Sequence, residues 1–540
     1  MLDSKKLWWH TGVIYQIYPR SFQDSNGDGI GDLRGIISRL DYLSEILKVD
    51  AIWLSPFYPS PQADFGYDVS NYSDVDPIYG DLDIFDSLVS ESHKKNLKII
   101  IDFVPNHSSN LHPWFISSRS SRTDSKRNWY VWKDAKQDGS PPNNWLAVFG
   151  GSAWEWDEKT KQYYLHSFLK EQPDLNWRNP DLKKAMLDSV EFWLKRGVDG
   201  FRLDVAHFIM KDEAMRDNPI NPNPATPDFK PMGDYDSILH IYDKGDPAVH
   251  DVLKEFRRLL DSYSTNSPRY SVGEIHVFDW KKWASYYGNN DELHMPFNFS
   301  FLVTPWQAKD IRRIVGELEA SLPDDAWPNY VMGNHDEPRL ATRLGLDRAR
   351  QVAMVLLTLR GTPTLYYGDE IGMTDVPIPE DKQQDPFGIR VPGLGRDPNR
   401  TPMQWDSSAC AGFTRVGGNP WLPVSENYLD INVEKELEDQ TSILNLYRTL
   451  LEYRRSSKAL SEGDYQVVDA KMGDCYVFLR KSGDQRVLVV INFSGMKTDL
   501  DLKSVGKGEI RISTFLNREG PVDLARLSLA PYEGLVIEVL

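Results

Sequence analysis

The sequence predicts an α/β protein built on a (β/α)8 barrel, with a small domain inserted after the third strand and a C-terminal antiparallel β-sandwich domain. Short apolar runs alternate with amphipathic helical stretches over most of the 540 residues, which is typical of parallel strands covered by helices. The alternation lapses once, over residues 108–174, a stretch too long for an ordinary loop. After about residue 457, short strand patterns separated by turns replace it.

The strands and helices of the barrel follow one another in regular order. The predicted strands span residues 13–22, 51–58, 97–107, 199–208, 270–276, 295–301, 329–339 and 362–370. The predicted helices begin near residue 32 and then span residues 83–95, 182–195, 249–262, 280–287, 311–322, 349–359 and 443–453. The first helix is predicted from an apolar stripe formed by Leu33, Ile36, Ile37, Leu40, Leu43 and Leu47. Eight strand–helix pairs predict a TIM barrel.

The expected domain boundaries lie where the alternation stops and resumes. Residues 1–107 and 175–457 are the two parts of the barrel, residues 108–174 the inserted domain, and residues 458–540 the C-terminal β domain. Within the second part, the Pro-, Asn- and Asp-rich residues 217–246 are expected to form a long loop after the fourth strand.

The composition argues against several classes of protein. A net charge of -17 at pH 7 disfavours nucleic-acid and anionic-membrane partners. The chain contains no run of about 18 apolar residues, so we expect no membrane span. Its first residues show no apolar segment typical of a signal peptide. Only two cysteines, Cys410 and Cys475, are present, which is typical of free thiols in a reducing compartment. We therefore expect a cytoplasmic protein.

The stretch DSNGDGIGDLRG, residues 24–35, places oxygen-bearing residues at alternate positions, as calcium loops do. The candidate donors are the side chains of Asp24, Asn26, Asp28 and Asp32 and the backbone carbonyl of Ile30. An EF-hand requires a bidentate Glu at position 12, whereas Gly35 occupies that position and no helix precedes the loop. The stretch is not an EF-hand, and its residues alone leave open a calcium loop of another kind or a solvated turn.

Polar residues end four of the predicted strands, and active sites of barrels lie at the carboxyl ends of the strands. They are Asp102, Asn106 and His107 after the third strand, Arg202 and Asp204 after the fourth, Glu274 after the fifth, and Asn334, His335 and Asp336 after the seventh. Any one carboxylate is explained by an ordinary ion pair, but uncompensated like charges that converge would repel one another. Such a cluster suits glycoside hydrolysis, in which one carboxylate attacks the anomeric carbon and another protonates the leaving oxygen. We expect a small oligosaccharide as the substrate.

At these residues the sequence resembles the α-amylase family, glycoside hydrolase family 13. The matching motifs are DFVPNH at residues 102–107, GFRLD at 200–204, GE at 273–274 and NHD at 334–336, in the family's order. The stretches QIYPRSFQDSNGDGIGDLRGI, GYDVSNY, QPDLNW and RTPMQWD are similar to its α-glucosidase and oligo-1,6-glucosidase branch. Non-enzymatic transporter subunits with this fold lack parts of the catalytic set that this chain retains, so we expect an enzyme.

The resemblance implies a role for each of these residues. Asp204 would be the nucleophile, Glu274 the general acid and base, and Asp336 the third carboxylate, which holds the hydroxyls of the sugar. The substrate-binding residues that it implies are Asp64, Tyr67, His107, Phe149, Phe168, Gln172, Arg202, Val205, His335 and Arg400, with Asp64 and Arg400 as the pair that closes the end of the pocket. It also implies that the loop at residues 24–35 holds a structural Ca²⁺.

The expected activity is that of a retaining, exo-acting α-glucosidase that releases terminal glucose from short α-glucosides and can transfer it to another sugar. In this branch, Val after the nucleophile, here Val205, accompanies cleavage of α-1,6 bonds, whereas Thr or Ala accompanies α-1,4 preference. Departures from the branch at residues 207–212 and at Glu337 leave an α-1,4-glucosidase of the maltase type as the alternative. A sucrose isomerase and a trehalose-6-phosphate hydrolase are more distant alternatives. We expect no nucleic-acid or membrane partner, and a monomer or small homo-oligomer.

Overall fold

The computed structural model describes residues 7–540, apart from residues 228, 266 and 470–473. Its central sheet contains eight parallel strands in the order β10-β11-β1-β2-β3-β7-β8-β9. These are β1 (Ile14–Ile17), β2 (Ala51–Leu54), β3 (Lys98–Phe103), β7 (Gly200–Leu203), β8 (Tyr270–Gly273), β9 (Met295–Pro296), β10 (Asn329–Val331) and β11 (Thr362–Tyr366). Each strand neighbours the next strand of the barrel in the chain, so the predicted fold class is confirmed.

The barrel is nearly closed between β9 and β10. Among the described residues no ladder joins these two strands, but the side chain of Asn329 bridges them. Its Oδ1 accepts a hydrogen bond from the N–H of Asn298 at 3.0 Å, and its Nδ2 donates to the carbonyl of Pro296. β9 is shorter than the predicted strand because the chain turns after Pro296 and enters α9 (Ser300–Val303).

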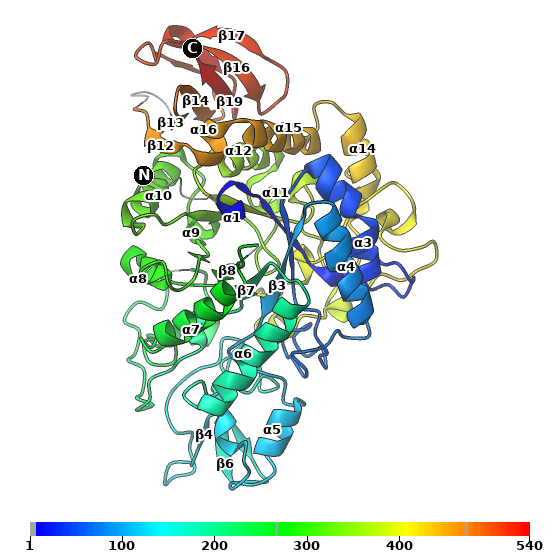
Figure 1. The fold of residues 1–540 in the computed structure, drawn as a ribbon, viewed down its shortest axis with the longest axis vertical. Coiled ribbons are helices and arrows are strands. Elements are labelled where there is room, and N and C mark those ends of the chain that lie inside the picture. The colour runs from blue at the N-terminus through cyan, green and yellow to red at the C-terminus, as the bar shows by residue number, and fades with distance from the viewer. Residues whose placement is uncertain (1–6, 228, 266, 470–473) are drawn as a thin grey trace.

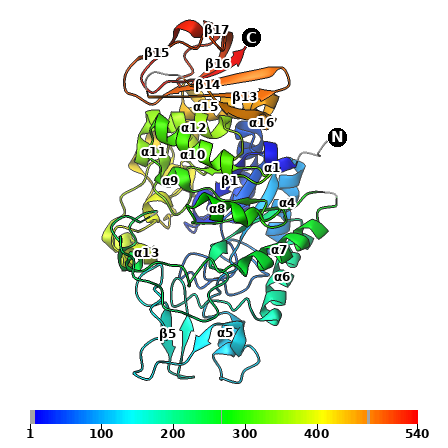
Figure 2. The same ribbon diagram turned by 90° about the vertical axis from the view of Figure 1, so that its left-hand side faces the viewer.

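Helices surround the sheet, as Figures 1 and 2 show. The long ones are α4 (Leu82–Lys94), α6 (Pro180–Lys195), α7 (Val249–Ser262), α10 (Ala308–Ser321), α12 (Leu346–Thr358) and α15 (Ile443–Ser456). Shorter ones are α1 (Trp8–Thr11), α2 (Pro19–Phe22), α8 (Trp280–Ala284), α11 (Leu340–Leu344), α13 (Pro386–Arg390), α14 (Val433–Glu438) and α16 (Lys458–Glu462).

The structure departs from the predicted first strand and first helix. β1 ends at Ile17 because Pro19 begins α2, where a proline without an N–H suits the first helical position. The predicted helix after it consists of α3 (Leu33–Ser38), capped by Asp32, and a π-helical segment, η1 (Tyr42–Leu47). The predicted apolar stripe packs into the core, with only Ile37 partly buried, so the pattern located the buried face but not the break.

The inserted segment after β3 forms its own small sheet at one end of the barrel, in cyan in Figure 1. It contains α5 (Pro113–Ser118) and three antiparallel strands in the order β4 (Trp132–Lys133), β6 (Gln162–Leu165) and β5 (Trp154–Asp157). Buried Lys211 ties the segment to the barrel, because its Nζ lies 2.6 Å from Asp174 Oδ2 and 2.6 Å from Asn106 Oδ1. The segment therefore covers the carboxyl ends of the strands.

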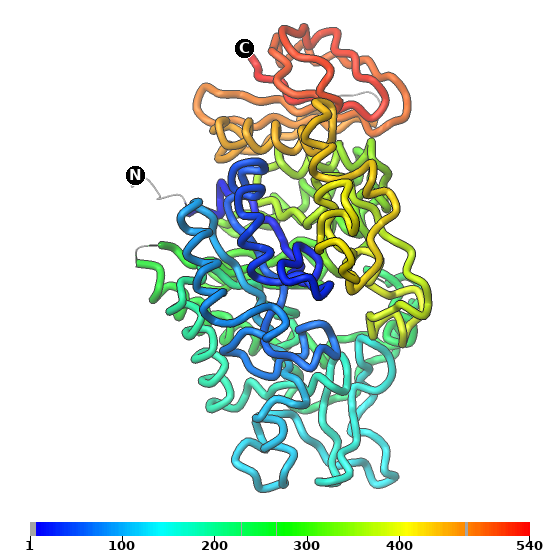
Figure 3. Tube along the Cα trace, turned by 90° about the vertical axis from the view of Figure 1, so that its right-hand side faces the viewer, coloured from blue at the N-terminus to red at the C-terminus, as the bar shows by residue number. Residues whose placement is uncertain are grey.

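The C-terminal domain lies at the opposite end of the barrel (Figures 1 and 3). Its six-stranded sheet contains β12 (Asp464–Val467), β13 (Cys475–Ser482), β14 (Gln485–Asn492), β19 (Gly534–Val539), β16 (Lys507–Ser513) and β17 (Gly520–Asp523) in that spatial order. A two-stranded sheet, β15 (Thr498–Leu500) with β18 (Leu527–Leu529), contributes to one core with it. The exact domain boundaries stay a prediction.

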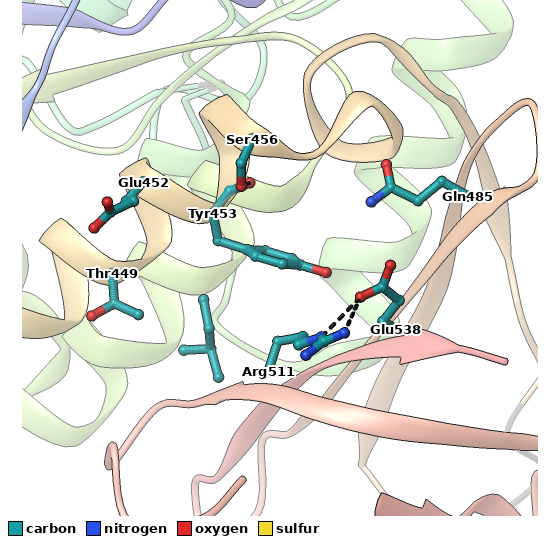
Figure 4. A pocket seen from close by; sticks show the side chains of 8 residues that line it. Thr449, Glu452, Tyr453, Ser456, Gln485, Arg511 and Glu538 are labelled. Carbon is teal, nitrogen blue, oxygen red and sulfur yellow. Dashed lines mark hydrogen bonds and ion pairs between the residues drawn. The ribbon is translucent and has the colours of Figure 1, made fainter. Parts of the chain in front are cut away.

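A cavity of about 470 Å³ lies between α15 and the C-terminal sheet (Figure 4). Tyr453 and Gln485 line it together with Arg511, which pairs with Glu538 at 2.7 Å. None of the residues proposed for catalysis lines this cavity.

None of the helices that the described residues form combines the length and apolarity needed to cross a bilayer. The expectation about an N-terminal targeting segment concerns residues 1–6, which lie outside the described residues.

Candidate active site

Arg202 holds three carboxylates from three strands at the carboxyl end of the barrel. Arg202 lies on β7, and its Nη1 donates to Oδ1 of Asp102 and to Oδ1 of Asp204, both at 2.7 Å. Its Nη2 donates to Oε2 of Glu274 at 2.6 Å. All four side chains are buried, so these charge-assisted hydrogen bonds act in a medium of low dielectric and are strong. The structure thus brings Arg202, Asp204 and Glu274 together.

The chain turns sharply directly after Asp204. Asp204 follows β7, and its N–H donates to the carbonyl of Phe103 at 2.8 Å, which continues the pairing with β3. Val205 then adopts φ 35° and ψ 47°, a left-handed conformation that is rare for a β-branched residue. Such a conformation costs about 1–3 kcal/mol and persists only where its surroundings require it. The bend directs the N–H of Val205 to Oε2 of Glu274 at 3.0 Å.

Glu274 is held from both sides. It follows β8, and its Oε2 accepts hydrogen bonds from Arg202 and from the N–H of Val205. Its Oε1 faces His276, whose Nε2 lies 2.8 Å away. The sequence analysis did not single out His276. Its position two residues after Glu274, on the same side of the strand end, is the signal that could have found it.

Asp336 lies beyond the end of β10, among positive groups. Its Oδ1 is 3.1 Å from Nη1 of Arg396 and 2.8 Å from Nη2 of Arg400. Its Oδ2 lies 3.3 Å from Nε2 of His335. The ring of His335 is fixed by Tyr67, whose hydroxyl lies 2.6 Å from Nε2, and by Gln16 at 2.8 Å from Nδ1.

A second network joins the inserted segment to the barrel. The amide Nε2 of Gln172 lies 3.1 Å from Oδ2 of Asp64 and 3.1 Å from Nε2 of His107. Asp64 forms its ion pair with Arg396, at 2.7 Å, whereas Arg400 pairs with Asp336. That Asp64 and Arg400 close the end of the pocket stays a prediction. Arg396 precedes Arg400 by only four residues, so the sequence could not decide which of them reaches Asp64.

Arg396 is the main residue that the sequence analysis missed. It binds Asp64, Asp336 and Asp385 simultaneously, at distances between 2.7 and 3.1 Å. Its guanidinium also lies 5.1 Å from the ring centre of Phe149. An arginine presents five N–H donors in a rigid planar fork, which suits it to bind several carboxylates at once.

The aromatic residues that the sequence singled out share one cluster. Phe149 and Phe168 pack edge to face with ring centres 5.7 Å apart, and Val205 belongs to the same buried group. Phe387 of α13 stacks on Phe149 at 4.6 Å. The inserted segment and α13 thus enclose the side of the site on which Val205 lies.

Asp204 and Glu274 share a guanidinium and therefore titrate as a coupled pair. Burial raises the pKa of Asp204 well above its ordinary value, and the charge of Glu274 raises it further. Burial also acts to raise the pKa of Glu274, but Arg202 and His276 outweigh burial and lower that pKa. In this arrangement Glu274 is therefore ionised.

Burial and nearby charges also shift the pKa values of the other ionisable groups of the site. Burial raises the pKa of Asp102 to about 7. Burial opposes ionisation of Asp336 as well, but the nearby positive charges of Arg396 and Arg400 help to hold its pKa well below the ordinary value. Burial lowers the pKa of His107 to about 4 and that of His335 to about 3. Both histidines are therefore neutral near pH 7, and each can donate and accept a hydrogen bond.

The predicted calcium donors lie together in one loop, but their oxygens are engaged elsewhere. Oδ1 of Asp24 accepts hydrogen bonds from two N–H groups of the loop, and its Oδ2 accepts from Gly29 and from Thr414 at 2.5 Å. Asp32 caps α3 and also accepts from the N–H of Ser25. In the described part of the chain no three His, Cys, Asp or Glu side chains are arranged to hold a metal ion. In this arrangement the carboxylate oxygens of Asp24 and Asp32 serve as hydrogen-bond acceptors, and calcium stays a prediction.

A (β/α)8 barrel that gathers buried carboxylates around one arginine at its strand ends has the architecture of a glycoside hydrolase. Residues 16–463 match the model of the alpha-amylase catalytic domain, and residues 465–536 match that of the maltogenic amylase C-terminal domain. The chain belongs to the alpha-amylase family.

Relatives support this assignment over nearly the whole length. The chain is 43% identical to a probable alpha-glucosidase of Rhizobium meliloti (strain 1021), an alignment that covers 92% of this chain and 91% of the relative. It is 39% identical to the oligo-1,6-glucosidase of Parageobacillus thermoglucosidasius, with 99% of each chain covered. Its fold is similar to the crystal structure of the alpha-glucosyl transfer enzyme XgtA, with a TM-score of 0.93, 42% identity, and coverage of 99% of this chain and 100% of the other.

Proposed function

We propose that this protein is a retaining α-glucosidase that removes terminal glucose from short α-glucosides. The observation that carries the proposal is the guanidinium of Arg202, which binds Asp204 through one terminal nitrogen and Glu274 through the other. One guanidinium bridges two carboxyls only when they lie close together. Retaining glycosidases have carboxyls about 5–5.5 Å apart, whereas inverting enzymes separate them by about 6.5–9.5 Å.

The reaction proceeds by two displacements. Asp204 attacks the anomeric carbon, the bond to the leaving oxygen breaks, and Glu274 supplies a proton to that oxygen. Water then attacks the glycosyl ester, gives a proton to Glu274 and releases glucose with its original configuration. A sugar hydroxyl that replaces this water yields a transfer product. Because the resting arrangement favours an ionised Glu274, a proton must reach this carboxyl before the first step.

The network of Asp64, His107, Gln172 and Arg396 supports an exo-acting enzyme. These side chains are buried and hydrogen-bonded to one another or to their neighbours. They offer fixed donors and acceptors for the hydroxyls of one terminal glucose.

An ion pair also lies next to the third carboxylate. Nζ of Lys230 lies 2.5 Å from Oε1 of Glu337, the residue that directly follows Asp336. This ion pair joins the loop at residues 217–246 to the end of β10.

The linkage preference is part of the proposal. Val205 contacts Glu274 through its backbone and packs with Phe149 and Phe168, so its side chain can border the site of the leaving sugar. We propose that α-1,6-linked isomalto-oligosaccharides are among the substrates, with an α-1,4-glucosidase of the maltase type as the alternative.

A phosphorylated substrate such as trehalose 6-phosphate is disfavoured. The pairing of Lys230 with Glu337 neutralises the charge of a cation near the leaving sugar.

A hydrolysis panel tests the proposal. The substrates are maltose, isomaltose, sucrose, trehalose and trehalose 6-phosphate, each followed by proton NMR from the first turnover. The anomer is read from sucrose, because its leaving group contributes no glucose of its own, and we expect α-glucose as the first glucose product. β-Glucose as the first glucose product from sucrose would contradict the retaining mechanism, and conversion of sucrose to an isomer would identify a sucrose isomerase instead.

We further propose that the loop at residues 24–35 takes up a structural Ca²⁺ and that the protein is a cytoplasmic monomer or small homo-oligomer. The donor chemistry of Asp24, Asn26, Asp28 and Asp32 supports the calcium proposal, although Asp24 and Asp32 must exchange hydrogen bonds of the loop for the ion. The two free cysteines, Cys410 and Cys475, support a reducing compartment.

A further inference from the structure

Only one of the two carboxyl oxygens of Glu274 can carry the proton that Glu274 must deliver. Oε2 already accepts hydrogen bonds from the guanidinium of Arg202 at 2.6 Å and from the N–H of Val205 at 3.0 Å. Neither group can accept a proton in return, because arginine and a backbone N–H are donors only. A proton on Oε2 would occupy a lone pair that now accepts one of these hydrogen bonds, whereas Oε1 has a lone pair to spare, so the transferable proton belongs on Oε1.

Oε1 faces an imidazole that can either give or take this proton. Nε2 of His276 lies 2.8 Å from Oε1, and among the described residues no other hydrogen bond to Oε1 is present. When the imidazole is charged, Nε2 donates to the carboxylate. When it is neutral with its hydrogen on Nδ1, Nε2 accepts from the protonated carboxyl. One proton can therefore move between the two atoms without any change in heavy-atom positions.

The surroundings hold the ring of His276 while leaving it in contact with solvent. Phe299 and Phe229 pack against it, with ring centres 4.7 and 5.1 Å away, and its side chain is 28% exposed. The charged and titratable groups that face the pair are Arg202, Asp204 and Asp336 beside Glu274, His207 beside the imidazole, and Lys230 over the Phe229 ring.

We propose that His276 is the proton-holding partner of Glu274, a role that rests on the proposed α-glucosidase function. Nε2 of His276 passes a proton to Oε1 of Glu274 across the 2.8 Å contact. Glu274 then protonates the leaving oxygen as Asp204 forms the glycosyl ester. In the second step the attacking water gives its proton to Oε1, and the pair regains the proton that it had lost. His276 acts through Glu274 and does not itself touch the reacting atoms, so it is a positioning residue.

The test compares His276→Gln and His276→Ala over a series of α-glucosides with leaving groups of different acidity. A Gln side chain retains a donor for Oε1 but cannot carry a proton. For maltose and phenyl α-glucoside we expect kcat/KM of both variants to fall by about a hundredfold. The leaving group of 2,4-dinitrophenyl α-glucoside departs without a proton, so for this substrate we expect kcat/KM to fall by about threefold or less. A purely structural role predicts near wild-type activity for Gln and an equal loss on all substrates for Ala, and either result would overturn the proposal.

The matched control is His250→Gln. His250 on α7 also pairs with a buried carboxylate, Glu292, at 2.7 Å and has the same side-chain exposure of 28%. It lies outside the site, and we expect no dependence on the leaving group.

Glu274→Gln is measured in parallel. If that variant retains hydrolysis of maltose, the proposed function fails; if it is inactive while the His276 variants show no leaving-group dependence, only the role of His276 fails.

Discussion

The N–H of Val205 donates a hydrogen bond to Oε2 of Glu274 at 3.0 Å, and Val205 does so from a left-handed backbone conformation with φ 35°. The residue after the expected nucleophile thus binds the expected acid directly. Release of the strain at Val205 would remove this hydrogen bond. The geometry of the two carboxyls therefore depends on a backbone conformation that the barrel imposes at the end of β7.

Substitution of Val205 tests the linkage preference. Thr is also β-branched, so Val205→Thr retains the backbone strain and changes mainly the polarity of the wall. We expect wild type to hydrolyse isomaltose with a higher kcat/KM than maltose, and the variant to shift this ratio toward maltose by about 1–3 kcal/mol of discrimination. Steady-state kinetics on both disaccharides measures the ratio. A wild-type preference for maltose of about tenfold or more, which is about 1.4 kcal/mol, would show that Val205 does not control linkage here.

Removal of either carboxyl of the central pair tests the catalytic assignment. We expect Asp204→Asn and Glu274→Gln to lower turnover of an aryl α-glucoside by about three orders of magnitude or more, because the first step needs an ionised nucleophile and the second a base. Thermal unfolding of both variants provides the control for an intact fold. An activity of about one tenth of wild type in either variant would refute the assignment.

A chelator tests the proposed calcium loop. A ligand that binds only the folded state raises stability by about 2.7 kcal/mol at a concentration one hundred times its Kd. We expect a chelator to lower the melting temperature of wild type while a brief assay at low temperature shows little loss of activity. Asp28→Asn is the matched variant, because Asp28 makes its side-chain hydrogen bonds within the loop. Metal analysis without calcium, together with unchanged melting in chelator, would count against the ion.

The buried imidazole of His112 predicts a loss of stability in acid. Its Nδ1 accepts the N–H of Trp114 at the start of α5, and burial lowers its pKa to about 3. The pKa of an unfolded histidine is about 6.5. Between these values the unfolded state binds more protons, so the free energy of unfolding falls as the pH decreases, by about 2 kcal/mol from this one group at pH 5.

His112→Asn provides the comparison, since Asn is also a good helix cap and does not titrate in this range. Urea unfolding at pH 7.5 and at pH 5 should show that the variant loses about 2 kcal/mol less than wild type between the two conditions. Equal losses in wild type and variant would mean that the imidazole is protonated in the folded state. His112 caps α5, away from the carboxylates of the site, so activity at pH 7.5 should be unchanged.

Much of the candidate site could be predicted because a barrel places its strand ends together. Asp204 and Glu274 follow strands whose apolar pattern is plain in the sequence, and the end of a parallel strand has a known location in this fold. The partner of Asp64 could not be predicted. Arg396 and Arg400 stand only four residues apart, and only the path of the chain around α13 decides which guanidinium reaches Asp64.

The sequence by itself determined the order of strands and helices, the fold class, and the residue types available at each strand end, because these follow from local periodicity. Only the tertiary structure decided which charges meet. It placed Arg202 between Asp204 and Glu274, brought His276 to Oε1, and turned the oxygens of Asp24 toward N–H groups of its own loop. The physical reason is that such contacts require distances of about 3 Å between atoms, and packing across the whole barrel sets those distances.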